Sequence, residues 1–228
     1  MTRTLHAARA AALLAALVTV GTAPAPHAPP LAPGAPASPA PVAQETTSPS
    51  EARVAIEDTV DAVSTLLNEE DKSQREKKQR FHEIVEARLD IDEISRRVLR
   101  NSWDDWRLSQ RNEFKALFVK HLVGIYWKKV DSDFEGIEIL EDSSEASVYW
   151  RVKTRVDVEN APSVEIEFIL QKRRNATDWK IIDLLIDRVS QVSLFRDDYT
   201  PIVRGGGPEA LLAALEKKVA AEDADTDG

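Results

Sequence analysis

The first part of the folded region repeats apolar residues at steps of three and four, which places them on one face of an α-helix. Four helices are predicted: one capped by Ser50, one over residues 73–88, a short one opened by Asp90 or Asp92, and a long one capped by Ser109. The long helix carries a wide apolar stripe that consists of Phe114, Leu117, Phe118, His121, Leu122, Ile125 and Tyr126. Core packing is the simplest explanation of this stripe, and the lining of a cavity is the alternative that would bear on function.

After Asp131 the apolar positions alternate with polar ones, as they do in a half-buried β-strand. Four strands are predicted, at residues 137–140, 147–158, 164–171 and 179–189, with turns near residues 142–144, 160–162 and 174–177. The connections between these strands are short, which favours an antiparallel meander with one packed face and one solvated face.

The carboxy-terminal segment returns to a helical pattern. It is predicted to hold a helix over residues 194–203, a break at the three glycines 205–207, and a further helix that begins at Pro208. Helices before and after a four-stranded meander indicate an α+β fold, with the helices against one concave face of the sheet. We expect this domain to occupy residues 50–219, followed by an acidic disordered tail at residues 220–228.

The first 49 residues are typical of an export signal followed by a spacer. Arg3 and Arg9 precede an uncharged apolar run at residues 10–20. This run is too short to span a membrane, and the arrangement fits a secretory signal peptide. We assign residues 1–25 to this peptide, with cleavage after Ala37 as the alternative. Nine of the twelve prolines lie within residues 24–49, so residues 26–49 are predicted to form an extended, disordered spacer.

Composition narrows the possible functions. The chain contains no cysteine, so no disulfide, thiolate nucleophile, zinc–thiolate site or cysteine-linked lipid anchor can form. Its formal net charge is −9 at pH 7, which gives no general attraction to nucleic acid or to an anionic membrane surface. We expect a soluble monomer in the periplasm that binds no nucleic acid.

Candidate catalytic and metal-ligating residues are few. His82 and His121 are the only histidines after the spacer, and neither has a readable partner for nucleophilic catalysis. For His121, on the apolar stripe, a hydrogen-bonded packing role is favoured. Residues 131–142 resemble a calcium-binding loop only in their first half, because Asp142 stands where a bidentate glutamate is needed. We predict no cofactor and no metal site.

Asp183 is the most suggestive single acid in the sequence. Strict alternation would place it on the same face as Trp179, Ile181 and Leu185, toward the core. A carboxylate there could be the general base of an enzyme similar to ketosteroid isomerase. It could instead accept backbone N–H groups at the start of a helix, which would offset the cost of its burial. The structural role is favoured, because the sequence offers no second member of a catalytic pair.

Taken in order, these elements resemble the MlaC (toluene-tolerance) family of periplasmic phospholipid carriers, over residues 53–218. The matching segments are Leu99 to Trp106, the helix that runs from Gln110 and Arg111 through Phe114, Phe118 and Leu122 to Tyr126, Trp179 to Asp183, Val189 and Ser190, Arg196 to Tyr199, and Gly207 to Leu215. One departure is Arg188, which stands where the family usually has glycine, and this leaves the backbone bend at that position in question.

The resemblance implies an NTF2/cystatin-like fold, in which helices pack on the concave face of a curved four-stranded antiparallel sheet. It also implies a cleft that takes acyl chains while the headgroup stays in solvent. The residues expected to contact lipid come from both layers: Val98, Trp103, Phe114, Phe118, Leu122, Tyr126, Val152, Val164, Ile166, Phe168 and Val189.

The function implied by the resemblance is the transport of phospholipid without enzymatic activity. The expected partners are an outer-membrane lipoprotein–porin complex and the MCE-domain subunits of an inner-membrane ABC transporter, and the expected outcome is outer-membrane lipid asymmetry. A carrier of another lipid, such as a hopanoid, remains an alternative. So do an NTF2-like enzyme, which would need a catalytic dyad inside the fold, and a structural adaptor, which would have a solid core.

Overall fold

In the computed structural model, the described residues are 50–132, 134–146, 148–158, 162–174 and 176–224. The predicted signal peptide and spacer therefore lie outside the described residues. Among the helices that are described, none is long and apolar enough to cross a membrane.

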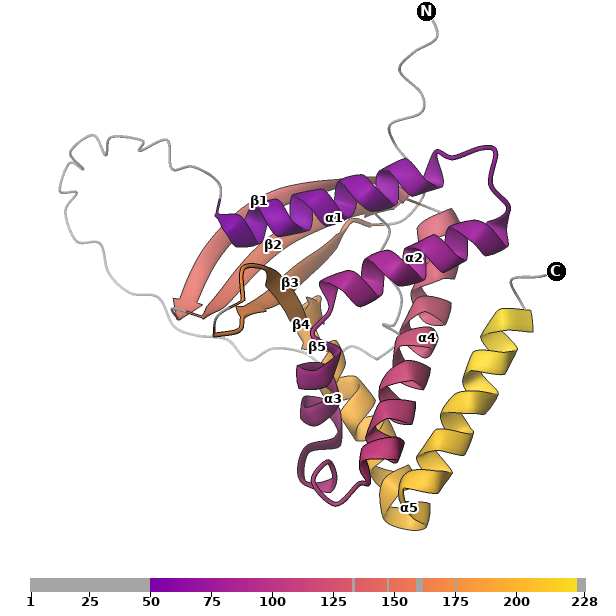
Figure 1. The fold of residues 1–228 in the computed structure, drawn as a ribbon. Coiled ribbons are helices and arrows are strands. Elements are labelled where there is room, and N and C mark those ends of the chain that lie inside the picture. Colours follow the sequence, from indigo (N-terminus) through magenta and orange to yellow (C-terminus); the bar gives the residue numbers. More distant parts are fainter. Residues whose placement is uncertain (1–49, 133, 147, 159–161, 175, 225–228) are drawn as a thin grey trace, which may run out of the picture.

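The described chain starts with helices, continues with strands and ends with a long bent helix (Figure 1). The α-helices are α1 (Glu51–Leu67), α2 (Gln74–Arg88), α3 (Ile91–Leu99), α4 (Leu108–Ser132) and α5 (Gln191–Ala224), and a 3-10 turn, η1 (Arg100–Ser102), follows α3. The strands are β1 (Phe134–Ala146), β2 (Tyr149–Val158), β3 (Val164–Lys172), β4 (Trp179–Ile186) and β5 (Val189–Ser190). The predicted α+β class is confirmed.

The strands form one antiparallel sheet in the order β1-β2-β3-β4-β5. Helix α1 lies along this sheet, with α2 beside it, while α3, α4 and α5 gather toward the β4–β5 side (Figure 1). Helices α2, α3 and α5 all contact β4. The helical layer and the sheet therefore meet around β4, and this is where the candidate site lies.

Side-chain caps fix the starts of the first three helices. The hydroxyl of Ser50 accepts the backbone N–H of Arg53 at 3.0 Å, as predicted for α1. Ser73 and Glu76 form a reciprocal capping box at the start of α2, which satisfies two backbone donors that the helix itself leaves free. Asp90 caps α3 in the same way as Ser50 caps α1.

Helix α4 begins at Leu108, one residue before its predicted cap. The side-chain oxygen of Gln110 accepts the backbone N–H of Arg107 at 2.9 Å. Ser109 already lies inside the helix, so its predicted capping role is wrong. The physical reason is that glutamine at the third helical position can reach back to the residue that precedes the helix.

Strand β1 is longer than predicted and continues to Ala146. Asp142, Ser143 and Ser144, predicted to form a turn, pair with residues 150–152 of β2, so that prediction is wrong. Strand β1 lies at the edge of the sheet, where one side of the backbone faces away from the other strands and polar residues are tolerated.

A two-residue turn divides the predicted fourth strand, so the sheet has five strands among the described residues instead of four. Ile186 pairs with Val189, and the residues between them, Asp187 and Arg188, have φ values of 46° and 69°. Two successive positive φ values are what a type I′ hairpin turn needs. The bend at Arg188 is therefore present although glycine is not, and this conformation costs a residue with a Cβ about 1–2 kcal/mol.

Aromatic side chains join α4 to α5 in the core. The ring of Phe118 packs edge-on against Phe195 and Tyr199 of α5, with ring centroids 5.1 and 6.0 Å apart. Phe114 stacks on Phe118 at 5.3 Å, and both side chains are fully buried. Such edge-on and offset pairs add to the hydrophobic gain from burying these rings. The predicted stripe of α4 is thus part of the core.

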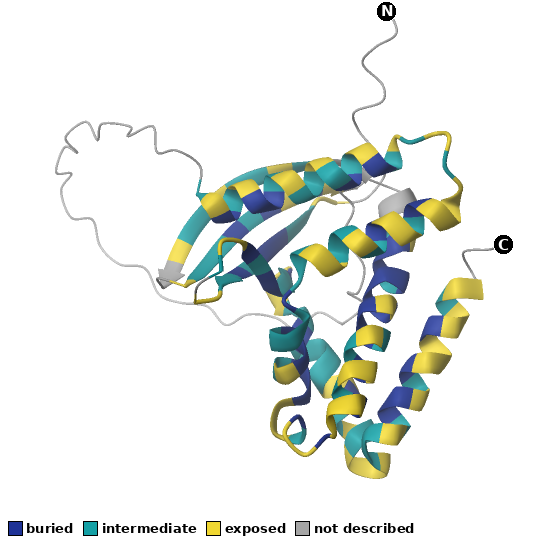
Figure 2. Ribbon diagram, in the orientation of Figure 1, coloured by how far each residue is buried: buried dark blue, intermediate teal, exposed yellow. Residues whose placement is uncertain are grey.

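Helix α5 bends at Gly207, which lies in the predicted glycine break and has φ 72° and ψ −167°. Residues with a Cβ very rarely adopt this combination. The second half of the helix then runs back beside α4, with its buried positions turned toward α4 (Figure 2). Leu211, Leu212 and Leu215 are among these buried residues.

The helix continues to Ala224, so residues 220–224, predicted as part of a disordered tail, are helical. Long-range contacts hold them: Nδ1 of His121 lies 2.7 Å from Oε1 of Glu222, and Nζ of Lys78 lies 2.9 Å from Oδ1 of Asp223 and donates to the carbonyl of Glu222 at 3.3 Å. Helical periodicity cannot reveal contacts between residues this far apart in sequence. The hydrogen-bonded packing role predicted for the buried His121 is confirmed.

The glycines of α5 provide a test of the bend. Gly207→Ala should lower the free energy of unfolding by about 1–3 kcal/mol, because the added Cβ is incompatible with the backbone conformation at Gly207. Gly205→Ala is the matched control, since its new Cβ would meet no other atom within 4 Å, and it should raise stability by about 0.5–1 kcal/mol. Chemical denaturation measures both changes. Equal effects of the two substitutions would contradict the proposed role of the bend.

Candidate functional site

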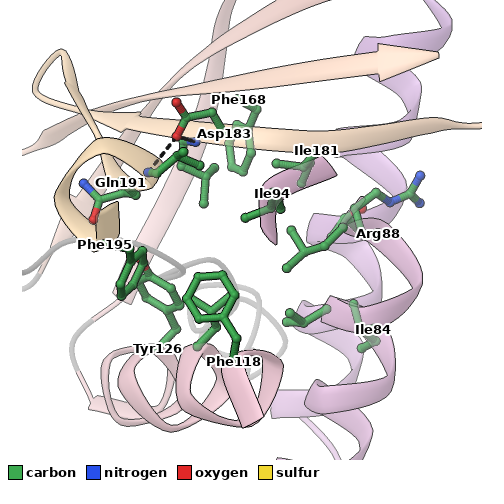
Figure 3. Close-up of a pocket in the computed structure, with 16 residues that line it drawn as sticks. Ile84, Arg88, Ile94, Phe118, Tyr126, Phe168, Ile181, Asp183, Gln191 and Phe195 are labelled. Carbon is green, nitrogen blue, oxygen red and sulfur yellow. Dashed lines mark hydrogen bonds between the residues drawn. The ribbon is translucent and has the colours of Figure 1, made fainter. Parts of the chain in front are cut away.

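A cavity lies between strands β3 and β4 and helices α1 to α5 (Figure 3). The side chains that line it are Thr59, Ile84, Val85, Arg88, Leu89, Ile94, Phe118, Leu122, Tyr126, Phe168, Ile181, Asp183, Leu184, Gln191, Val192 and Phe195. Twelve of these sixteen side chains are apolar or aromatic. The volume is about 70 Å³, and since a water molecule needs roughly 10–15 Å³ of such space, there is room for only a few.

Helix α4 supplies one wall of the cavity. Phe118, Leu122 and Tyr126 follow one another at intervals of four residues, so they lie one above the other on a single face of the helix. Phe195 of α5 extends this wall, because its ring lies edge-on to Phe118. The result is an apolar surface of rings and methyl groups without hydrogen-bonding groups apart from the Tyr126 hydroxyl.

The opposite wall comes from the sheet, and a bulge in β4 shapes it. Ile181 pairs with Leu170, whereas Asp183 pairs with Ile169, so the register shifts by one residue between them. Ile181 and Asp183 nevertheless both line the cavity, so the expectation that they share a face holds, whereas Leu184 takes the place expected for Leu185, because an extra residue reverses the alternation. Beyond the bulge, Leu184 comes to lie opposite Phe168, and both line the cavity.

The Asp183 carboxylate holds the start of helix α5. It accepts the hydroxyl of Ser190 at 2.6 Å and the backbone N–H groups of Leu184 and Val192 at 2.8 and 3.1 Å. Ser190 in turn accepts the backbone N–H of Ser193 at 3.1 Å. A helix start leaves backbone donors unpaired and favours negative charge, so this carboxylate is well placed. The structural role favoured from the sequence is confirmed.

The other polar side chains of the lining are Thr59, Arg88 and Gln191. The Thr59 hydroxyl donates to the carbonyl of Ala55 in its own helix at 2.7 Å. The Gln191 amide donates to a backbone carbonyl two residues earlier, at 3.2 Å. These two side chains thus have protein partners and leave the space to apolar groups.

Burial raises the pKa of the Tyr126 phenol far above its ordinary value, and the charge of Asp183 raises it further. Tyr126 therefore stays protonated near neutral pH and cannot act as a base there. Asp183 is the only carboxylate among the described lining residues, and no histidine lies among them. The catalytic dyad that an NTF2-like enzyme would need is thus not found in the described lining.

Neither His121 nor any described residue of the segment 131–142, which partly resembles a calcium-binding loop, lines the cavity. His121 contacts Glu222 and does not line the cavity. Strand β1 begins at Phe134, inside the segment that partly resembles a calcium loop, where a loop would be needed. Within the part of the chain that the structure describes, no group of three or more histidine, aspartate or glutamate side chains could hold a metal ion.

Four of the residues predicted to contact lipid line the cavity: Phe118, Leu122, Tyr126 and Phe168. Seven do not. Five of these seven are buried in the core away from the cavity, and they are Val98, Trp103, Phe114, Val152 and Ile166. Val164 is half-buried and Val189 is 43% exposed in the short strand β5. Contact with lipid stays a prediction for all eleven residues, and the geometry favours the four that line the cavity.

The sequence interpretation missed the contributions of α2 and α5. Ile84 and Val85 were recognised as apolar positions of α2, but a short amphipathic pattern does not tell which structure the helix covers. Val192 and Phe195 come to the cavity because Asp183 fixes the start of α5 beside β4. This last signal was present in the sequence, in the preference of aspartate for helix starts.

Fold and site together define an α+β protein with a mainly apolar cavity between its sheet and its helices. The family model described as "MlaC protein" matches residues 57–217, well over half of the chain, and the chain belongs to this family. The predicted membership is confirmed.

Among solved structures, the fold is similar to that of the phospholipid-binding protein from Ralstonia solanacearum in complex with a phospholipid. The TM-score is 0.66 and the sequence identity is 16%, and the match covers 76% of this chain and 99% of the other. At this identity the likeness concerns the fold. No curated protein sequence matches the chain.

The hydrogen bonds of Asp183 generate a prediction. Asp183→Asn replaces one accepting oxygen by an NH₂ group, which cannot accept a hydrogen bond, and should lower the free energy of unfolding by about 1–3 kcal/mol. Urea denaturation followed by circular dichroism measures the change.

Asp187→Asn is the matched control for this substitution. Asp187 is exposed, and its φ of 46° is one that asparagine tolerates, so stability should change by less than about 0.5 kcal/mol. If Asp183→Asn were as stable as the control, the start of α5 would not depend on the carboxylate.

Proposed function

We propose that this protein carries a phospholipid through the periplasm, with the acyl chains enclosed between the sheet and the helices. The observation that carries the proposal is the cavity, whose described lining is apolar on the sheet side and on the helix side. Membership of the MlaC family and the phospholipid bound to the Ralstonia solanacearum protein support the choice of ligand. No catalytic activity is part of the proposal.

The physical requirement on such a carrier is near-complete enclosure. Each methylene group that returns to water loses roughly 0.8 kcal/mol, so chains left exposed would make the complex unstable in solution. Apolar side chains meet this requirement without directional contacts, because the hydrophobic effect depends on the area removed from water. The rings of Phe118, Tyr126, Phe168 and Phe195 offer large areas of this kind.

A cavity of about 70 Å³ is too small for an acyl chain, so the proposal requires that the walls separate when lipid enters. We assign the movement to α2, because this helix carries the half-buried lining residues Ile84 and Val85, whereas the start of α5 is held to β4 by Asp183. The opposite wall is held by the sheet, because β3 pairs along its length with β2 on one side and with β4 on the other. The closed form then protects the apolar lining when no lipid is bound.

The transport route is the finer part of the proposal. The carrier would be a monomer that exchanges lipid with an outer-membrane lipoprotein–porin complex and with MCE-domain subunits of an inner-membrane ABC transporter, and so maintains outer-membrane lipid asymmetry. The apolar run at residues 10–20 supports export. Because the carrier hydrolyses nothing, the direction of transfer would follow from the relative affinities of its partners.

Bound lipid is the first expected outcome. Protein purified from its own periplasm should contain close to one diacyl lipid per folded chain, as measured by native mass spectrometry and by analysis of the extracted lipid. Repeated recovery of protein without lipid, from native cells as well as from an expression host, would contradict the proposal.

A pair of substitutions tests whether the cavity is the binding site. Leu122→Trp places an indole where the lining faces open space, so it should reduce lipid occupancy severalfold and change the melting temperature little. Val152→Trp is the matched control, because Val152 is fully buried outside the cavity, and overpacking there should destabilise the fold by about 1–3 kcal/mol.

The comparison needs both occupancy per folded molecule and melting temperature. The folded fraction of Val152→Trp should bind as much lipid as the unmodified protein. A Leu122→Trp protein that melts at a much lower temperature, yet binds lipid normally, would show that the lipid lies elsewhere.

A further inference from the structure

Two charged side chains line the apolar cavity, and they come from different elements. Asp183 belongs to β4 and its carboxylate reaches the start of α5, and Arg88 is the last residue of α2. Figure 3 shows them on different sides of the cavity, with Asp183 near Gln191 and Arg88 beyond Ile94. The cavity therefore has a negative side and a positive side.

Only the negative side is fully engaged in hydrogen bonds. The Asp183 carboxylate accepts three of them. By contrast, within the described ranges the Arg88 guanidinium has neither a hydrogen bond nor an ion pair with another residue. All five of its N–H donors are available to a ligand.

The orientation of Arg88 suits a ligand that is apolar inside and polar outside. The side chain is half-buried, and its guanidinium points away from the rings of Phe118, Tyr126 and Phe195 (Figure 3). The methylene stem thus borders the cavity while the charged end reaches water. A lipid has the same order of groups, from its chains to its headgroup.

The charged residues near Arg88, Lys180 and Asp178, are already paired with each other. Nζ of Lys180 donates to the carbonyl of Ala87 at 2.5 Å and lies 2.8 Å from the carboxylate of Asp178. The hydrogen bond from Lys180 lowers the pKa of Asp178, and the charge of Arg88 has a smaller effect in the same direction. Asp178 is thus already paired with Lys180, and the nearby carboxylates of Asp90 and Asp92 are paired with Arg173, so these carboxylates have cationic partners other than Arg88.

We propose that Arg88 binds the phosphate of the carried lipid and makes the protein selective for diacyl lipids that bear a phosphate. The proposal rests on the proposed function. A guanidinium matches the geometry of phosphate oxygens with two parallel hydrogen bonds. The competing anion site, the start of α5, is occupied by Asp183, whose charge repels phosphate. The lipid then lies with its phosphate beside α2 and its chains toward the rings.

Arg88 also lies in the last turn of α2, where any cation stabilises a helix end. That role alone would make Arg88→Lys equivalent to the unmodified protein and would leave lipid preference unchanged in every variant. Headgroup preference is therefore the measurement that separates the two roles.

The test is a competition for the delipidated full chain between phosphatidylglycerol and diacylglycerol that carry the same two acyl chains. Both lipids are offered at equal amounts in mixed micelles, and native mass spectrometry counts each complex. The unmodified protein should prefer the phospholipid by about tenfold or more, as expected for charged hydrogen bonds. Arg88→Gln should bring the ratio close to one while total occupancy is kept, and Arg88→Lys should fall between.

Arg75→Gln is the matched control, because it removes one positive charge from the other end of the same helix, about 20 Å away along its axis. It should keep the preference of the unmodified protein. If Arg88→Gln fails to fold, Arg88→Met takes its place, since methionine keeps an unbranched apolar stem beside the cavity.

Two results would overturn the assignment of Arg88 and leave the carrier function intact: equal binding of both lipids by the unmodified protein, or a preference that persists in the folded Arg88→Gln protein. Binding of neither lipid by the unmodified protein would overturn the proposed function, and the role of Arg88 with it.

Discussion

The hydrogen bonds of one carboxylate decide how the two layers of this protein meet. Asp183 comes after a bulge in β4 and accepts the backbone N–H of Val192 at 3.1 Å, so the sheet and the start of α5 are joined directly. This contact sets the direction in which α5 leaves the sheet. Phe195 and Tyr199 then reach the rings of α4, and the bend at Gly207 returns the helix along α4.

The same arrangement explains why an apolar space is left beside a well-packed core. The first turns of α4 pack against α5 through Phe114, which contacts Tyr199, whereas Phe118, Leu122 and Tyr126, further along the same face, have the cavity beside them. An empty apolar space forgoes contacts that a solid core would gain. A protein that encloses acyl chains gains those contacts from its ligand. The unfilled apolar space is therefore what the proposed function requires.

Family membership and the details of the site rest on different kinds of observation. The family follows from the order and spacing of many residues over positions 57–217. The polarity of the cavity depends on two individual residues, Arg88 and Asp183, and on whether each is already hydrogen-bonded in the fold. A similar fold at 16% identity does not fix such details, so the charge pattern of the cavity is a property of this chain's own residues.

The sequence by itself determined the α+β class, the helix start at Ser50 and the apolar stripe of α4, because these depend on local spacing and on caps within one turn. It left Asp90 and Asp92 open as the start of α3, and the structure shows Asp90 as the cap. Only the tertiary structure decided which half of the stripe faces open space, where β4 bulges, and that the helix continues past residue 219. A bulge is invisible to strict alternation, and the pairing of His121 with Glu222 joins residues about a hundred positions apart. Local patterns show which residues are buried, but which element each buried face packs against depends on contacts between residues far apart in sequence.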